Sequence, residues 1–175
     1  MFGGLGEPHS AKPPMDRDGF RVLVSRLTAQ IGDQRLDAAL GERLNRDHPP
    51  GSDTYDAIFA ACRAGLAAGW ICHREAGGIR YGRVVDAGPD THGFSVDVVD
   101  MRECVGPHHV HPAGEIDLVM PLEGPAEFDG QPAGWKVYAP GSDHFPTVRG
   151  GRALVLYLLP AGAIKFTGKR ASEMP

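Results

Sequence analysis

The sequence lacks several features that would place it in a large class of proteins. Its 18 basic and 22 acidic residues give a net charge of -4, and no run of Lys or Arg is present to follow a phosphate backbone. We therefore expect no nucleic-acid partner. The longest apolar run, ALVLYLLPAGAI, is interrupted by Pro160 and Gly162, and it is shorter than the roughly 20 residues that span a bilayer. We also expect no membrane partner.

Cysteine is scarce as well. Cys62, Cys72 and Cys104 are an odd number, and their spacing matches neither a disulfide framework nor a CxxC metal site. Such usage is typical of a reducing compartment, in which these residues act as small buried hydrophobes. The start MFGGLGEPHSAKPPM has no basic stretch followed by an apolar one, as a secretory signal would have. These observations predict a cytoplasmic protein.

The chain divides into four stretches. At 175 residues it is long enough for one well-buried domain. Residues 1–17 are rich in Gly and Pro and predict a flexible tail. Apolar residues recur at helical spacing over 18–68, which predicts an N-terminal segment of three helices; the stripes are Phe20, Leu23, Val24, Leu27 and Ile31, then Leu36, Leu40 and Leu44, then Tyr55, Ile58, Phe59, Cys62 and Leu66.

From residue 69 to 168 the pattern changes to short apolar or alternating runs separated by turn residues. The runs are WICHRE, IRYGRVV, FSVDVVDM, EIDLVMPL, WKVYA and ALVLYLL. This rhythm is typical of a small antiparallel β-barrel or sandwich. Residues 169–175 are expected to form a C-terminal tail.

The segment HHVHPAGE carries the strongest chemical signal. In a strand, His109 and His111 point to the same face, so both imidazoles can reach one ion, whereas His108 points away. Glu115 follows the turn-like PAG. His144 lies after a Pro-Gly turn in a distant strand that a neighbouring wall could bring opposite the first pair. Imidazole nitrogens and one carboxylate oxygen suit a divalent metal ion such as Zn, Fe, Mn, Ni or Co.

Two further carboxylates have open roles. Asp117 shares the face of Glu115, and it could support a histidine, donate a proton or be solvated. If Glu115 is itself the proton donor, the metal has only three imidazole ligands, and the sequence leaves both cases open. Asp97 lies on the face opposite Val96 and Val98, so it is either a buried acid in a lumen or a surface acid.

Candidate substrate-binding residues come in two pairs. Arg80 and Arg83 fall on opposite faces of IRYGRVV, so at most one points inward, where its planar fork would match a benzoate carboxylate. Trp135 and Tyr138 also face opposite ways, and either could stack on an aromatic ring or belong to the core.

These residues resemble a known pattern. His109-x-His111-x-x-x-Glu115 followed by Pro140-Gly141-x-x-His144 is similar to the two motifs of the cupin superfamily. The resemblance covers residues 70–167. It implies a mainly β fold, a cupin-type antiparallel β-barrel (double-stranded β-helix) preceded here by the N-terminal helical segment. It also implies a metal held by His109, His111, Glu115 and His144.

A narrower resemblance covers nearly the whole chain. The stretches ALGERLN, CRAGLAAGWICHREAGGIRYGRV and GPHHVHPAGEIDLVMPLEGPAEFDGQPAGWKVYAPGSDHFPTVRGGRALVLYLLP resemble the small bacterial 4-hydroxylaminobenzoate lyases. That family implies conversion of a small aromatic acid, 4-hydroxylaminobenzoate, to 3,4-dihydroxybenzoate and ammonia. Glu115 and Asp117 are the candidate catalytic acids.

Two other functions fit the same pattern. A non-haem iron dioxygenase or isomerase would use the same ligands and would depend on iron. A non-enzymatic, ligand-sensing cupin would bind metal or ligand without turnover. For the helical segment we expect packing against the barrel or against a second copy of the chain, and hence a homo-oligomer, most simply a dimer.

Overall fold

The computed structural model describes residues 15–173. The expected N-terminal tail therefore lies almost entirely outside the described residues. Three helices open the described chain: α1 (Arg17–Ile31), α2 (Ala38–Asp47) and α3 (Asp53–Ala68). Each begins after a residue whose side chain accepts a hydrogen bond from a backbone N–H of the first turn, namely Asp16, Asp37 and Ser52. The predicted N-terminal helical segment is confirmed.

The remaining chain forms two antiparallel sheets. The large sheet has the strand order β1-β2-β3-β9-β5-β7, with β6 also pairing with β9, and the small sheet has the order β10-β4-β8. The strands of the large sheet are β1 (Arg74–Ala76), β2 (Ile79–Val85), β3 (Phe94–Val105), β5 (Glu115–Glu123), β6 (Glu127–Phe128), β7 (Gly134–Tyr138) and β9 (Thr147–Pro160). Those of the small sheet are β4 (His109–His111), β8 (Ser142–His144) and β10 (Lys165–Phe166). Short 3-10 helices span Pro89–Thr91 and Ala171–Glu173.

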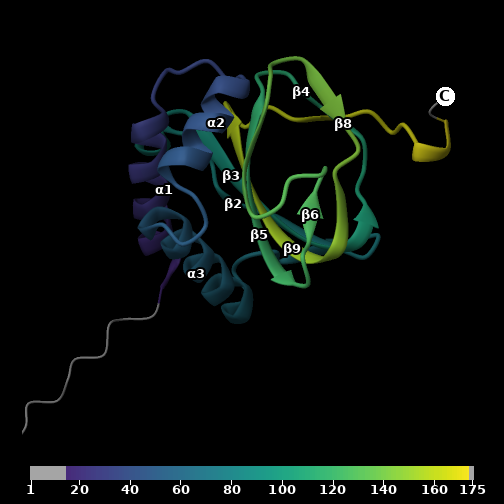
Figure 1. Ribbon diagram of the computed structural model, residues 1–175, viewed down its shortest axis with the longest axis horizontal. Coiled ribbons are helices and arrows are strands. Elements are labelled where there is room, and N and C mark those ends of the chain that lie inside the picture. Colours follow the sequence, from purple (N-terminus) through teal and green to yellow (C-terminus); the bar gives the residue numbers. More distant parts are fainter. Residues whose placement is uncertain (1–14, 174–175) are drawn as a thin grey trace, which may run out of the picture.

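The large sheet has two different faces because side chains alternate along each strand. One face packs against the helices, which Figure 1 shows gathered on one side of β2, β3, β5 and β9. Val96, Val98 and Leu118 belong to the apolar cluster on this side, together with side chains from all three helices. The opposite face carries a second cluster that includes Val99 and Val155. This inner face, which also bears Glu115, lies toward the small sheet.

The predicted mainly β, cupin-type architecture is confirmed, with one difference in its closure. Within residues 15–173 no ladder joins the two sheets, so they form a sandwich and not a closed barrel. None of the helices in this part of the chain has the length and apolar character needed to cross a membrane.

The predicted strand at WICHRE is shorter than its sequence pattern indicates. Pairing begins only at Arg74. The preceding segment folds back on the end of α3, because the backbone N–H groups of Trp70 and Ile71 both donate to Gly65 O. Cys72 has a φ of 54°, which a regular strand excludes. The apolar residues of this segment therefore serve the helix-facing core, where Ile71 and Cys72 are buried.

Candidate metal centre and adjoining cavity

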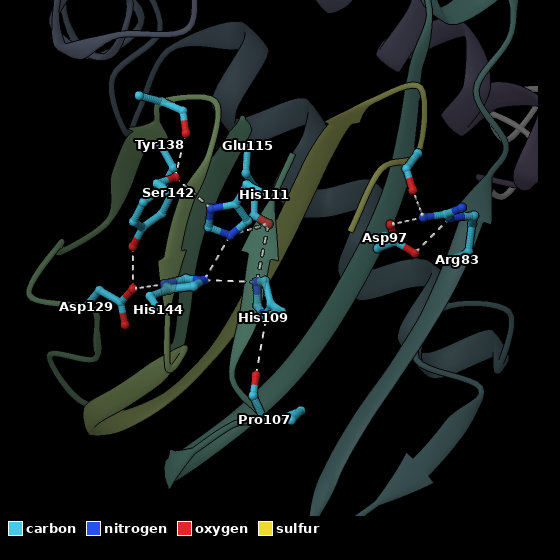
Figure 2. A network of polar contacts seen from close by, with 12 residues as sticks. Arg83, Asp97, Pro107, His109, His111, Glu115, Asp129, Tyr138, Ser142 and His144 are labelled. Atoms are coloured by element: carbon cyan, nitrogen blue, oxygen red, sulfur yellow. Dashed lines mark hydrogen bonds and ion pairs between the residues drawn. The ribbon is translucent and has the colours of Figure 1, made fainter. Parts of the chain in front are cut away.

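Four side chains from three strands converge between the sheets. β4 supplies His109 and His111, and its register with β8 sets His144 directly opposite His109. Glu115 opens β5 on the inner face of the large sheet. One ligand atom from each of these four residues lies within 4.8 Å of the others. Figure 2 shows the three imidazoles and Glu115 directed toward one point.

Two glycine turns bring these residues together. Gly114 has a φ of 88° and lets the chain reverse from β4 into β5, so Glu115 returns to the two histidines that precede it. An added Cβ at Gly114 would lie 2.8 Å from Tyr138 O, so a larger residue does not fit. Gly141 has a φ of 82° and donates its N–H to His111 O at 2.8 Å, which holds the start of β8 against β4.

Hydrogen bonds at the outer nitrogen define the tautomer of each imidazole. His109 Nδ1 lies 3.2 Å from Pro107 O, which can only accept. His144 Nδ1 lies 2.5 Å from the Asp129 carboxylate. His111 Nδ1 lies 3.0 Å from Ser142 Oγ, whose own proton goes to Ala139 O. Each Nδ1 therefore carries the proton, and each Nε2 presents a lone pair.

The inner atoms form a donor set that needs a positive charge. His144 Nε2 lies 3.0 Å from His109 Nε2 and 3.2 Å from His111 Nε2. Glu115 Oε2 lies 3.0 Å from His111 Nε2, and neither Glu115 oxygen has a hydrogen-bond partner among the described residues. Lone pairs packed this closely in a buried site repel one another unless a cation lies among them. Three imidazole nitrogens and one carboxylate oxygen fit a divalent metal ion.

Glu115 and Asp117 are both fully buried on β5. Burial and the charge of Glu115 raise the pKa of Asp117 well above its usual range. This shift favours the protonated form of Asp117.

Asp129, which no sequence pattern indicated, supports the site from outside. Its Oδ2 accepts from His144 Nδ1 and from the Tyr138 hydroxyl, and its Oδ1 accepts from the Thr147 N–H at 2.9 Å. Burial raises the pKa of Asp129, but the hydrogen bonds that it accepts from His144 and Tyr138 have the larger effect. The pKa of Asp129 is therefore below its usual range. The only local signal was the turn FDGQ, which reads equally well as a plain hairpin loop.

A cavity of about 530 Å³ adjoins the centre, and His109 forms part of its wall. This volume is typical of a site for a small organic ligand. Apolar side chains dominate the lining, among them Ile79, Val99, Met101, Ile164 and Phe166, while Arg83, Asp97 and Tyr157 supply polar groups. The ring of His109 lies 5.5 Å from the ring of Phe166, centroid to centroid.

The structure separates the paired candidates of the sequence analysis. Arg83 lines the cavity, whereas Arg80 lies on the opposite face, with its Nη1 4.0 Å from Asp100 Oδ2. Tyr138 packs on the rings of His111 and His144 at centroid distances of 5.0 and 4.6 Å. Trp135 is buried in the helix-facing core and donates its indole N–H to His48 O at 2.8 Å, away from the cavity.

A converging set of three imidazoles and one carboxylate between two antiparallel sheets defines the class: this is a cupin-type protein with a candidate divalent-metal centre. Sequence comparison gives the family. Residues 22–166 match the family of 4-hydroxylaminobenzoate lyases. The chain belongs to this family.

Two curated relatives agree with that assignment. The 4-hydroxylaminobenzoate lyase of Pseudomonas putida is 33% identical over 167 residues, covering 86% of this chain and 95% of the relative. The 4-hydroxylaminobenzoate lyase of Nocardioides sp. (strain LMS-CY) is 36% identical over 132 residues, covering 70% of this chain and 78% of the relative.

Solved structures match only part of the chain. An RmlC-like cupin protein from Ralstonia eutropha has a TM-score of 0.37 and 11% identity, over 49% of this chain and 57% of that one. A cupin-like protein from Thermotoga maritima has a TM-score of 0.35 and 17% identity, over 56% of this chain and 83% of that one. The family assignment rests on the sequence relatives.

Proposed function

We propose that this protein converts 4-hydroxylaminobenzoate and one water to 3,4-dihydroxybenzoate and ammonia, with a divalent metal ion bound by His109, His111, Glu115 and His144. Family membership supports this activity. The proposal of a metal ion is supported by the set of three Nε2 lone pairs and one unpartnered carboxylate next to an apolar cavity. A bound divalent ion would supply Lewis acidity toward an oxygen of the substrate or toward water.

The donor set indicates a class of metal ions and not one particular metal. The nitrogen-rich donor set favours Zn, Fe, Mn, Ni or Co over Ca or Mg, which prefer oxygen ligands. Elemental analysis of the purified protein distinguishes among these ions. The cysteine usage supports a cytoplasmic location, which remains part of this proposal.

The buried acids manage the proton that the reaction needs. As the N–O bond breaks, Asp117 gives a proton toward the departing oxygen, which leaves as water. Asp117 suits this role because its side chain is buried next to Glu115 and neither of its oxygens has a hydrogen-bond partner among the described residues. Glu115 stays ionised as a ligand in this scheme.

The remaining steps balance without an external oxidant. Loss of the hydroxyl leaves the nitrogen and ring electron-poor, and a water adds at the neighbouring ring carbon, returning one proton to the Asp117 carboxylate. Hydrolysis of the C=N bond then releases ammonia, and transfer of the ring hydrogen restores the aromatic ring. The nitrogen gains the two electrons that the ring loses. The apolar cavity wall shields these electron-poor species from bulk water.

The test is anaerobic incubation of metal-analysed protein with 4-hydroxylaminobenzoate, following ammonia and 3,4-dihydroxybenzoate. We expect equal release of both products without oxygen. His109→Ala should lose both metal and activity, whereas His108→Asn, which alters the neighbouring imidazole that bonds Asp143 and Thr167, should keep the metal. No product from metal-loaded protein would overturn the proposal. Product formed only with oxygen would favour a dioxygenase.

A further inference from the structure

A polar row crosses the inner face of the large sheet between the cavity and the metal centre. Arg83 on β2 lies opposite Asp97 on β3, Asp97 lies opposite Tyr157 on β9, and Tyr157 lies opposite Asp117 on β5. Residues directly opposite one another in antiparallel strands share a face. The row therefore runs in strand order from a guanidinium to the carboxylate beside Glu115. Arg83, Asp97 and Tyr157 all line the cavity.

Arg83 is held rigidly with one group free. Its Nε and Nη2 donate to the two oxygens of Asp97, each at 3.1 Å, and Nη2 also donates to Gly162 O at 3.3 Å. Its Nη1 has no hydrogen-bond partner among residues 15–173. Figure 2 shows this pair across the interior from His109. The two-point pairing aligns the planar guanidinium, so its free N–H groups are already oriented for a second anion.

The lining of the cavity contains two guanidinium groups, those of Arg74 and Arg83. Asp97 is the one carboxylate of this lining among the described residues, and it pairs with Arg83. The other lining groups between Arg83 and His109 are mainly apolar, with Tyr157 and Phe166 providing aromatic surface.

We propose that Arg83, aligned by Asp97, binds the carboxylate of the aromatic substrate and so selects anionic, para-substituted rings. The ring then lies between Tyr157 and Phe166, whose centroids are 6.4 and 5.5 Å from that of His109. Because Arg83 and the metal centre lie across the interior from each other (Figure 2), a substituent para to the carboxylate faces the metal centre. Meta and ortho substituents face the walls. This assignment rests on the proposed function for the identity of the ring.

The first test measures binding alone, with 4-nitrobenzoate as an anionic probe and nitrobenzene as its neutral counterpart. Arg83→Gln should weaken 4-nitrobenzoate binding to the metal-loaded protein by about 10-fold or more, because a charge-assisted hydrogen bond is lost. The binding of nitrobenzene should not change. Arg80→Gln is the matched control on the opposite face and should change neither. Arg83→Lys keeps the charge without the fork and should fall between. The double variant Arg83→Gln/Asp97→Asn gives the same comparison if Arg83→Gln does not fold with Asp97 unpaired.

The second test uses turnover. Arg83→Gln should raise KM for 4-hydroxylaminobenzoate by about 10-fold or more and leave the kinetics of phenylhydroxylamine unchanged. Wild-type protein should prefer 4-hydroxylaminobenzoate to its meta isomer. Unchanged 4-nitrobenzoate binding in a folded Arg83 variant would overturn the anchor, and so would equal weakening of both probes. If the wild type binds 4-nitrobenzoate but releases no ammonia, and Arg83→Gln weakens that binding, the role of Arg83 stands and the proposed lyase activity fails.

Discussion

At the scale of single residues, the outer nitrogens of the three imidazoles set the properties of the inner ones. Each Nδ1 donates a hydrogen bond, to Pro107 O, to Ser142 Oγ or to the Asp129 carboxylate. Every Nε2 is therefore free to bind a cation. Of these partners only Asp129 is an anion. It therefore both orients His144 and places a negative charge beside its ring.

Asp129→Asn should accordingly lower the metal affinity by about 10-fold or more. The amide keeps the shape of the carboxylate but removes the charge and one acceptor for His144, Tyr138 and Thr147. Competition with a chromogenic chelator measures the effect. Asp143→Asn is the control, because Asp143 bonds His108, which is not a ligand. Equal metal affinity in Asp129→Asn and wild type would contradict this account.

How much of the site the sequence predicted depended on how local the signal was. His109, His111 and Glu115 are close in sequence, so strand alternation and one turn were enough to predict that their side chains converge. Asp129 was missed because its role comes from the packing of a hairpin loop against β8. The choice between Arg80 and Arg83 required knowing which face of β2 meets the small sheet.

At the scale of elements, the helices and the large sheet are joined by polar contacts as well as by the apolar core. The Tyr55 hydroxyl of α3 donates to Val119 O of β5 at 2.9 Å. Asn45 of α2 pairs with the backbone of Trp135 on β7, donating to its carbonyl and accepting from its N–H, both at 2.8 Å. These contacts align α2 and α3 with the strands beneath them.

Tyr55→Phe should lower the free energy of unfolding by about 1 kcal/mol near neutral pH, because Val119 O loses its donor. Burial raises the pKa of Tyr55 from 10.0 to about 12. Below pH 10 both states keep the phenol proton and the stabilisation is complete. As pH rises from 10 toward 12 the unfolded state ionises first, so the stabilisation falls and is lost above the folded pKa.

Urea unfolding at about pH 8 and about pH 11 tests this sign, since the gap between wild type and Tyr55→Phe should shrink at the higher pH. The exposed Tyr81 provides the control, and Tyr81→Phe should leave stability unchanged at both pH values. A gap that stays constant or widens with pH would refute the assigned role of the hydroxyl.

The packing of neighbouring elements also explains why the strand at WICHRE was predicted too long. WICHRE has the apolar content of a strand, yet its first residues complete the core beneath α3. Periodicity over so short a run does not distinguish a strand from a buried connection. The neighbouring helix end decided the outcome.

At the scale of the whole molecule, the candidate metal centre joins the two sheets. His109, His111 and His144 belong to the small sheet, and Glu115 belongs to the large one. Within residues 15–173 no backbone ladder connects the sheets. A metal ion held by all four would therefore act as a cross-link between the sheets.

Metal binding should consequently stabilise the folded state. At a free metal concentration about 100 times Kd the gain is about 2.7 kcal/mol, which for a chain of this size raises Tm by about 5 to 10 °C. Differential scanning calorimetry with and without a chelator measures the shift. His144→Ala should show a much smaller one. An unchanged Tm after a chelator is added to metal-loaded wild type would contradict the cross-link.

The expected homo-oligomer stays a prediction, which light scattering tests.

The order of amino acids by itself specified the kinds of ligand, the three helices and the alternating strands, since each depends on contacts within a few residues. The arrangement in space decided which arginine faces the cavity, that Asp129 supports His144 and that the sandwich stays open. These features join segments far apart in the chain. Their geometry depends on how the sheets pack, which no local pattern contains.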